Sequence, residues 1–523
     1  MKKILLIAIL IVAAAILAAC GSDDDTYNNG NGGDEVVSSP ENGDDNYDDN
    51  YTEEGYNESY GGYYDYLSVE DDYEYGTVDA NEQSEGDLLP EDEDLYELDA
   101  DERQRRWVSD ITQLREHVFA THPKFNYEGI SGLDRNIVIG EAFDARLNDL
   151  ISSIEEYTDF EMLLGIQRAL SVFNDGHLQF HGQGRGRSFL NSLRMERFPL
   201  KFQWMGDGLY LLMAHERFAA ALNHRLVSIN DIAFDDIYSA FNEFFSIENI
   251  YHARDTLEFH INRPGILHAL GITDGDDATF AFATADGGII DISLTQADAF
   301  ATANFFDSNW HDFDGIVYSR AAGEPLLLSL NPGRRMWLHH FEDYGILYIR
   351  FEVFLQVDAG FSGLTTAVRN ILQTYELRAV IIDARNNGGG DHDAFMTIFQ
   401  LAAEHAPPGM LFYFMNESTF SAAAVAAGIM YGLGATLVGQ PSGQNIDIYY
   451  FVHQTGDVPY WVRLSYANYT VAVPNRFQTR RDVGIDTPDL ILRPHVLIET
   501  TIDDWINNRD PLFEYVLGLL EDE

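Results

Sequence analysis

Hydrophobic and polar positions divide the chain into three regions with different periods. From residue 103 to about 171, apolar residues recur at three- and four-residue steps, which predicts amphipathic helices. From 198 to 295 the apolar runs are short and alternating, which predicts a β-rich region with one helix near 234–245. From about 337 onward, strand patterns alternate with helical patterns, which predicts parallel β-α units. The expected fold class is a multidomain α/β and α+β protein.

The third region can be assigned element by element. Its strands are expected at 345–354 (GILYIRFEVF), 379–384 (AVIIDA), 410–415 (MLFYFM) and 435–439 (ATLVG). Its helices are expected at 361–375, 394–404, 421–431 and, near the end of the chain, 502–520.

The first twenty residues have the features of an export signal. Lys2 and Lys3 precede an apolar run from 4 to 17, which is too short for a comfortable membrane span. Small residues then lead to Cys20, the only cysteine of the chain, in a pattern that resembles the lipobox of bacterial lipoproteins. An ordinary signal with a chance cysteine is the alternative. If Cys20 is lipidated, residues 1–20 are a lipoprotein signal and no thiol remains for a disulfide or a nucleophile.

The segment 21–101 is expected to be a disordered acidic linker. Its first eighty residues contain 28 Asp and Glu and no Lys or Arg, with few aliphatic residues to build a core. It would hold the folded part away from a membrane, with a partner-binding tail as the alternative. The formal net charge of the whole chain is -53, which argues against nucleic acid as a partner.

Two motifs in the third region point to acyl transfer. The glycine turn NNGGG at 386–390 follows a strand directly, and Ser421 precedes an alanine-rich helix. A plain tight turn and a helix-capping serine are the alternatives. A serine nucleophile needs a base, and because the last lysine is Lys201, that base is expected to be a histidine or a carboxylate. His177, at a break between helix and strand, is the first candidate and His392 the second.

No cofactor or metal is expected, because the sequence has no H-E-x-x-H motif, no Cys/His cluster and no nucleotide-binding glycine motif.

Taken in order, several blocks resemble the tail-specific or C-terminal processing peptidases, a family that includes the tricorn core. The blocks are FNDGHLQF at 173–180, the strands with their glycine turn, STFSAAA at 418–424, ATLVGQPSG at 435–443 and VGIDTPDLIL at 483–492. HRLVSINDIAF at 224–234 resembles the core of a PDZ-like module. The resemblance implies a helical cap at 102–180, a degenerate PDZ-like module at 181–335 and a crotonase-like peptidase core at 336–523.

One branch of this family uses a Ser–Lys pair, but the loop GQPSGQN that would carry the lysine has none. The tricorn-like branch uses a histidine from the first block. The resemblance therefore implies Ser421 as nucleophile and His177 as general base, with an oxyanion hole from the backbone of Gly388 or Gly389 and of Ala422.

Three positions depart from the family pattern. The acidic residue usual three positions after the serine is Ala424, and the acid that would orient the histidine is replaced by Arg481. Asp482 or Asp175 could substitute for it. Gly176 stands where tricorn has a serine beside the histidine.

The predicted function is an exported serine peptidase, anchored to the membrane through Cys20, that cleaves peptides or unfolded protein ends. A weakened or inactive peptide-binding lipoprotein is the alternative. A solute-binding lipoprotein would require two similar α/β lobes.

Overall fold

The computed structural model describes residues 95–126, 133–180, 188–194, 196–275, 277–301, 314–321, 335–354, 358–451, 459–479 and 489–521. The predicted signal with Cys20, nearly all of the acidic linker, and the Arg481–Asp482 pair lie outside these residues. Within them the fold is mixed α/β, with several sheets and helices. Among the described helices, none combines the length and the apolar character that crossing a membrane requires.

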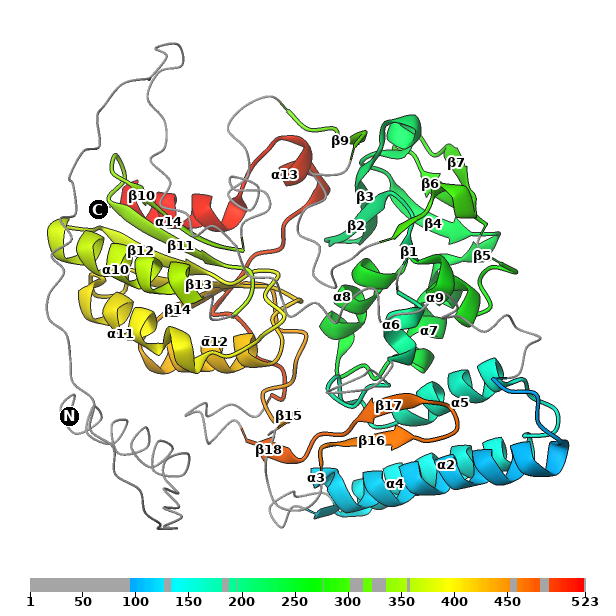
Figure 1. The fold of residues 1–523 in the computed structure, drawn as a ribbon. Helices are drawn as coiled ribbons and strands as arrows, with labels where there is room; N and C mark the ends of the chain where they lie inside the picture. Colours follow the sequence, from blue (N-terminus) through cyan, green and yellow to red (C-terminus); the bar gives the residue numbers. More distant parts are fainter. Residues whose placement is uncertain are drawn as a thin grey trace, which may run out of the picture. The chain divides into compact units, whose positions relative to one another are not determined.

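The first described elements form a helical layer (Figure 1). Its helices are α2 (Ala100–Thr121), α3 (Pro123–Asn126), α4 (Leu133–Ser152) and α5 (Asp159–Ser171). Asp99 caps the start of α2, and Thr158 starts α5 with a capping box that satisfies two orphan N–H groups. The helical prediction for this region is confirmed.

An antiparallel sheet follows. Its strands are β2 (Leu200–Met205), β3 (Gly208–His215), β4 (Arg225–Ile229), β5 (Ile232–Ala233), β6 (Ala278–Ala283), β7 (Ile289–Leu294) and β9 (Ile316–Tyr318). The short strands β1 (Glu196–Arg197) and β8 (Phe300–Ala301) pair separately, and α6 (Phe189–Ser192) precedes them.

The prediction of a single helix in this region is wrong. Besides α7 (Phe234–Phe244) the structure has α8 (Ile250–His260) and α9 (Pro264–Ala269). The buried face of α8 includes Thr256 and His260, so its apolar stripe is too weak to reveal a helix.

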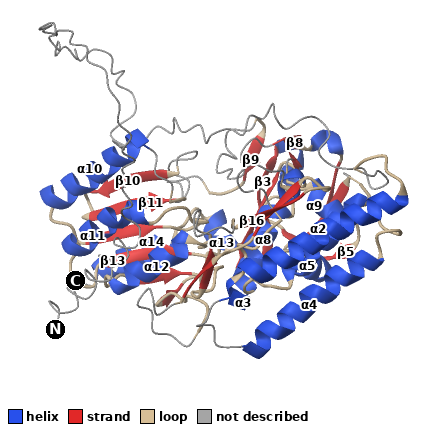
Figure 2. Ribbon diagram, turned by 60° about the horizontal axis from the view of Figure 1, so that its bottom comes forward, coloured by secondary structure: helices blue, strands red, loops and turns tan. Residues whose placement is uncertain are grey.

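The third region is a six-stranded sheet with helices on both faces (Figure 2). The strands, in sheet order, are β10 (Met336–Phe341), β11 (Ile346–Phe351), β12 (Ala379–Asp383), β13 (Leu411–Met415), β14 (Thr436–Gly439) and β19 (Val496–Leu497). All neighbours are parallel except β10 and β11. One face packs against α10 (Asp358–Thr374), α11 (Met396–His405) and α12 (Ala422–Gly432), and the other packs against α14 (Pro511–Glu521).

The parallel β-α prediction is therefore confirmed. The antiparallel sheet of the second region differs in kind from this sheet, so the described chain does not consist of two similar α/β lobes.

The helix expected at 502–520 is two helices, α13 (Ile502–Ile506) and α14. Asn508 adopts a positive φ of 57°, which ends the first. The Asp510 carboxylate then accepts hydrogen bonds from the backbone of Leu512 and Phe513, and Pro511 fits the first turn because it has no N–H to lose.

A hairpin from late in the chain completes the helical layer. It consists of β16 (Trp461–Leu464) and β17 (Tyr469–Ala472), and it lies near the pair formed by β15 (Ile448–Tyr450) and β18 (Arg476–Gln478). The Asp110 carboxylate on α2 accepts hydrogen bonds from the backbone of Tyr466 and Ala467. The helical layer, the antiparallel sheet and this hairpin share one apolar core. The apolar core is therefore continuous across the domain boundary expected at residue 180. The domain limits stay predictions.

Candidate active site

Ser421 has an unusual backbone conformation. It is the N-cap of α12 with φ 51° and ψ -126°, a region that residues other than glycine rarely adopt, and its side chain makes no capping hydrogen bond. Strain of this kind is held by the surrounding structure and is concentrated at functional sites. The interpretation of Ser421 as a helix-capping serine therefore has no support in its hydrogen bonding.

The glycine turn is held directly against the nucleophile turn. The side chains of Asn386 and Asn416, which follow the neighbouring strands β12 and β13, bond to one another at 2.7 Å. The Phe420 N–H donates to the Asn387 carbonyl at 3.2 Å. Carboxyl ends of parallel strands lie at one edge of a sheet, and the two predicted motifs meet there.

His177 is the histidine that reaches Ser421. Its Nε2 lies 3.0 Å from the Ser421 hydroxyl, across 244 positions of sequence. The imidazole packs against Phe420 and Phe451, with ring centroids 4.9 and 5.7 Å away. The rival, His392, lies instead beside Asp393, with 3.5 Å between Nε2 and the carboxylate.

The far side of the imidazole faces an amide. Gln444 Nε2 lies 3.1 Å from His177 Nδ1 and 3.3 Å from Glu248 Oε1. The Gln444 carbonyl oxygen accepts the N–H of Ser421, so one side chain contacts both the base and the nucleophile's backbone. Glu248 also accepts the backbone N–H groups of Gly176 at 3.1 Å and Asn445 at 2.9 Å.

Neither Gln444 nor Glu248 was expected from the sequence. Gln444 lies in the GQPSGQN loop, which drew attention only for lacking a lysine. Glu248 lies between α7 and α8, in the region expected to be β-rich. The available signal was a polar side chain in the loop where the Ser–Lys branch of the family that the sequence resembles carries its lysine.

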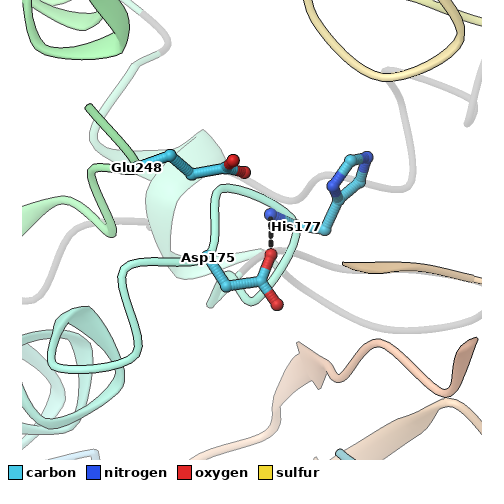
Figure 3. Close-up of side chains that lie close together, drawn as sticks. All are labelled: Asp175, His177 and Glu248. Atoms are coloured by element: carbon cyan, nitrogen blue, oxygen red, sulfur yellow. Dashed lines mark hydrogen bonds between the residues drawn. The ribbon is translucent and has the colours of Figure 1, made fainter. Parts of the chain in front are cut away.

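Asp175, expected as a carboxylate that orients the imidazole, acts elsewhere. One of its oxygens accepts the backbone N–H of His177 at 3.0 Å (Figure 3). The other oxygen contacts His122 Nε2 at 2.9 Å. Burial alone would raise the pKa of Asp175, but the hydrogen bond to His122 and the charges of His122, Lys124 and His177 together outweigh burial and lower it. Asp175 therefore fixes the backbone of His177 rather than its ring. The other candidate, Asp482, lies outside the described residues.

Gly176 leaves no room for a side chain. An added Cβ would lie 2.5 Å from Phe420 Cζ and 2.7 Å from His252 Cε1. The packing of these two rings against the turn accounts for glycine at a position where tricorn has a serine.

The three expected oxyanion donors differ in their surroundings. Gly389 has φ +115°, and an added Cβ would lie 2.6 Å from Ser421 Cβ, so this position requires glycine. Its N–H, however, already donates to Asn387 Oδ1 at 2.9 Å. Gly388 is exposed beside open space, and Ala422 begins α12, where helix N–H groups favour an anion. Gly388 and Ala422 remain the candidates.

Burial shifts the titration of the groups at this site. It lowers the pKa of His177, although Asp175 opposes the shift, and it lowers the pKa of His252 to about 4. Burial, reinforced by Asp175, raises the pKa of Glu248 to about 8. Both effects reduce charge at the site near neutral pH, and His177 is therefore a neutral imidazole there.

Asp175, His177 and Glu248 each bring one ligand atom within 4.8 Å of the others. Figure 3 shows these three side chains together. This is a spacing that a metal ion could bridge. Both carboxylates already accept hydrogen bonds from backbone N–H groups. The three residues are better described as parts of the network that positions His177.

No family model and no curated protein matches the chain. Among solved structures, mature CPAF is similar with a TM-score of 0.49 and 12% identity, over 80% of this chain and 97% of that one. The photosystem II D1 C-terminal processing protease has a TM-score of 0.32 and 15% identity, over 76% and 92% of the two chains. A putative S41 protease from Bacteroides fragilis has a TM-score of 0.29 and 11% identity, over 62% and 82%. These likenesses are loose, and the function must be argued from the residues of this chain.

Proposed function

We propose that this chain is a serine hydrolase that cleaves peptide bonds, with Ser421 as nucleophile and His177 as general base. The observation that carries the proposal is a serine in a strained conformation whose hydroxyl lies 3.0 Å from a partly buried imidazole. Nucleophile and base within hydrogen-bond reach are the signature of covalent catalysis by an activated serine.

The reaction would proceed by acyl transfer. The Ser421 oxygen attacks the carbonyl carbon of the scissile bond, and its proton passes to His177 Nε2. The N–H groups of Ala422 and Gly388 would stabilise the resulting oxyanion, and one such donor contributes about 10²–10³ in rate. The leaving amine takes the proton from His177, and a water molecule, deprotonated by His177, then hydrolyses the acyl-enzyme.

The substrates would be peptides or unfolded protein ends outside the cytoplasmic membrane. The resemblance of the sequence blocks to processing peptidases supports this substrate class. The signal-like segment at 1–20 supports anchoring through Cys20, and the acidic linker would give the enzyme reach from the membrane. Loss of surface attachment in a Cys20→Ala variant, measured by membrane fractionation, would support the anchor. Unchanged attachment would contradict it.

An active-site fluorophosphonate tests the nucleophile and the base. We expect the full chain to be labelled, Ser421→Ala to lose labelling, and His177→Ala to slow it by at least 10³-fold. Ser152→Ala and His392→Ala serve as matched controls and should label like the wild type. Because burial lowers the pKa of His177, the labelling rate should fall only as pH drops through a value below 6.5. Equal labelling of the wild type and Ser421→Ala would refute the assignment.

A second candidate is a peptide-binding protein without turnover. The contact that favours it is the Gln444 amide, which donates a hydrogen bond to His177 where active serine hydrolases have an acceptor. This candidate predicts peptide binding that is unchanged in Ser421→Ala, with no cleavage by either protein.

A further inference from the structure

The orientation of the Gln444 amide is determined by its neighbours. The backbone N–H of Ser421 can only donate, so the amide oxygen must face it. The amide nitrogen then faces both His177 Nδ1 and Glu248 Oε1. Glu248 Oε1 accepts this bond together with one from Gly176, and it is consistent with the same orientation.

This orientation determines the tautomer of His177. An amide nitrogen donates, so Nδ1 must offer its lone pair, and the proton of a neutral imidazole must then be on Nε2. The Nε2–H group points at the Ser421 hydroxyl, 3.0 Å away. In this state His177 donates to the serine and cannot take its proton.

A second histidine in the same network has the same proton arrangement. His122 Nδ1 accepts the backbone N–H of Lys124 at 3.1 Å, so its Nε2 donates to Asp175 at 2.9 Å. At His122 the donating Nε2–H group faces the Asp175 carboxylate, which accepts the hydrogen bond that a buried N–H group needs. At His177 it meets the hydroxyl that would have to be the nucleophile.

We propose that Gln444, held by Glu248, is the positioning residue that sets the tautomer of His177. In the resting arrangement the neutral imidazole carries its proton on Nε2. Ser421 is activated only when the group at position 444 accepts a hydrogen bond from His177 Nδ1. The inference deepens the proposed function and rests on it. Rotation of the amide by half a turn would present its oxygen to Nδ1 at the cost of the bond to Ser421 N–H, so the resting arrangement restrains the enzyme.

Histidine side-chain ¹⁵N NMR on the wild-type full chain tests the tautomer without any change at the site. With ¹⁵N-labelled histidine, the His177 signals are assigned by their loss in His177→Ala. We expect a protonated Nε2 and an unprotonated Nδ1, with His122 showing the same pattern as an internal reference. A wild-type His177 protonated on Nδ1 would overturn the proposal, whatever the activity.

Gln444→Glu tests the consequence. A carboxylate at 444 still accepts the Ser421 N–H, but it also accepts from Nδ1, so the proton should move to Nδ1 and leave Nε2 as a base. We expect fluorophosphonate labelling to become at least 10-fold faster, since the wrong tautomer costs about 10⁴ in a serine protease. Gln444→Met, similar in length but with no donor or strong acceptor, is the matched control and should not reach the rate of Gln444→Glu.

The two measurements separate the two proposals. Reversal of the His177 tautomer with faster labelling supports both. Reversal of the tautomer with no labelling keeps Gln444 as the positioning residue and refutes the hydrolase. A tautomer that stays unchanged in folded Gln444→Glu refutes the role of Gln444.

Discussion

Two polar clusters lie near the carboxyl ends of the neighbouring strands β12 and β13, and the ionisable groups of the two clusters shift in opposite directions. The arginine-paired cluster consists of Tyr348, Arg350, Asp383, Arg385 and Asp510. The carboxyl cluster consists of Asp255, Glu258, Glu417 and Ser418. The first supports the glycine turn, and the second supports the nucleophile turn.

In the arginine-paired cluster every acid has a cation beside it. Arg385 bonds to Asp383 at 2.6 Å and to Asp510 at 2.8 Å. Burial alone would raise the pKa of Asp383, but Arg385 and Arg350 outweigh it and hold that pKa below its ordinary value. Asp383 therefore stays ionised across the neutral range, and the glycine turn that follows it rests on a support that pH does not change in that range.

In the carboxyl cluster burial dominates. It raises the pKa of Glu417 to about 8 and that of Asp255 to about 6, and it raises that of Glu258 as well. Ser418 donates to Asp255, and Gln440 donates to Glu417 at 2.7 Å. The loop that carries Ser421 therefore rests on acids that include two, Asp255 and Glu417, whose protonation changes near neutral pH. The two turns of one site should respond differently to pH.

The largest expected effect is the loss of the central cation. Arg385→Met would leave Asp383 and Asp510 buried without their partner, and we expect it to lower the unfolding free energy by about 3–5 kcal/mol. Arg493→Met, which removes an exposed partner of Asp489, is the control and should cost less than about 1 kcal/mol. Urea unfolding at pH 7 measures both. Equal losses of unfolding free energy in the two variants would mean that the buried ion pairs of Arg385 contribute no more than an exposed ion pair.

The second effect is a pH-dependent gain from Glu417→Gln. The folded pKa of Glu417 lies above its ordinary 4.5, so the stability that it contributes is present below that value and is lost as pH rises through about 8. The variant should gain on the wild type by about 3–4 kcal/mol between pH 5 and pH 8, at about 1.4 kcal/mol per pH unit. Unfolding midpoints across this range measure the gain, and the exposed Glu155→Gln should follow the wild type. A constant difference at all pH values would contradict the raised pKa.

Asp255→Asn should give the smallest change in unfolding free energy, and this change should occur at lower pH than that of Glu417→Gln. Its carboxyl changes from an ordinary pKa of 3.8 to about 6 on folding, so the variant should gain about 2 kcal/mol between pH 4 and pH 6 and little more above that range. The same unfolding series measures this gain. If both variants gain over one common window, the two acids titrate together and must be treated as a single unit.

The sequence was most informative where one physical pattern dominated. Strands buried on both faces appear as continuous apolar runs, and for this reason 379–384 and 410–415 could be assigned with nearly correct ends. Ser421 and His177 could be singled out because few side chains supply a nucleophile or a base. Their contact, across 244 positions, is a product of tertiary structure.

The rest of the site depends on which loops the fold brings together. Nothing local distinguishes Glu248 from other acids, since its part comes from contacts with Gly176, Gln444 and Asn445. Asp175 was one of two candidates for orienting the imidazole, but it bonds to the backbone N–H of His177, because sequence proximity does not say which way a carboxylate turns. Whether the amide of Gln444 donates or accepts is decided by a backbone N–H 23 residues away.

The hairpin on the helical layer, formed by β16 and β17, affects when the site can assemble as the chain is synthesised. Its bonds to Asp110 span 356 positions, and the bridge from Ala472 pairs with Gln179, two residues after His177. Contacts this distant in sequence form late, because a long loop must close before they contribute. We expect the segment that carries His177 to settle only after the last fifth of the polypeptide has emerged. The imidazole of His177 and the hydroxyl of Ser421 would then come together only once nearly the whole chain has been made.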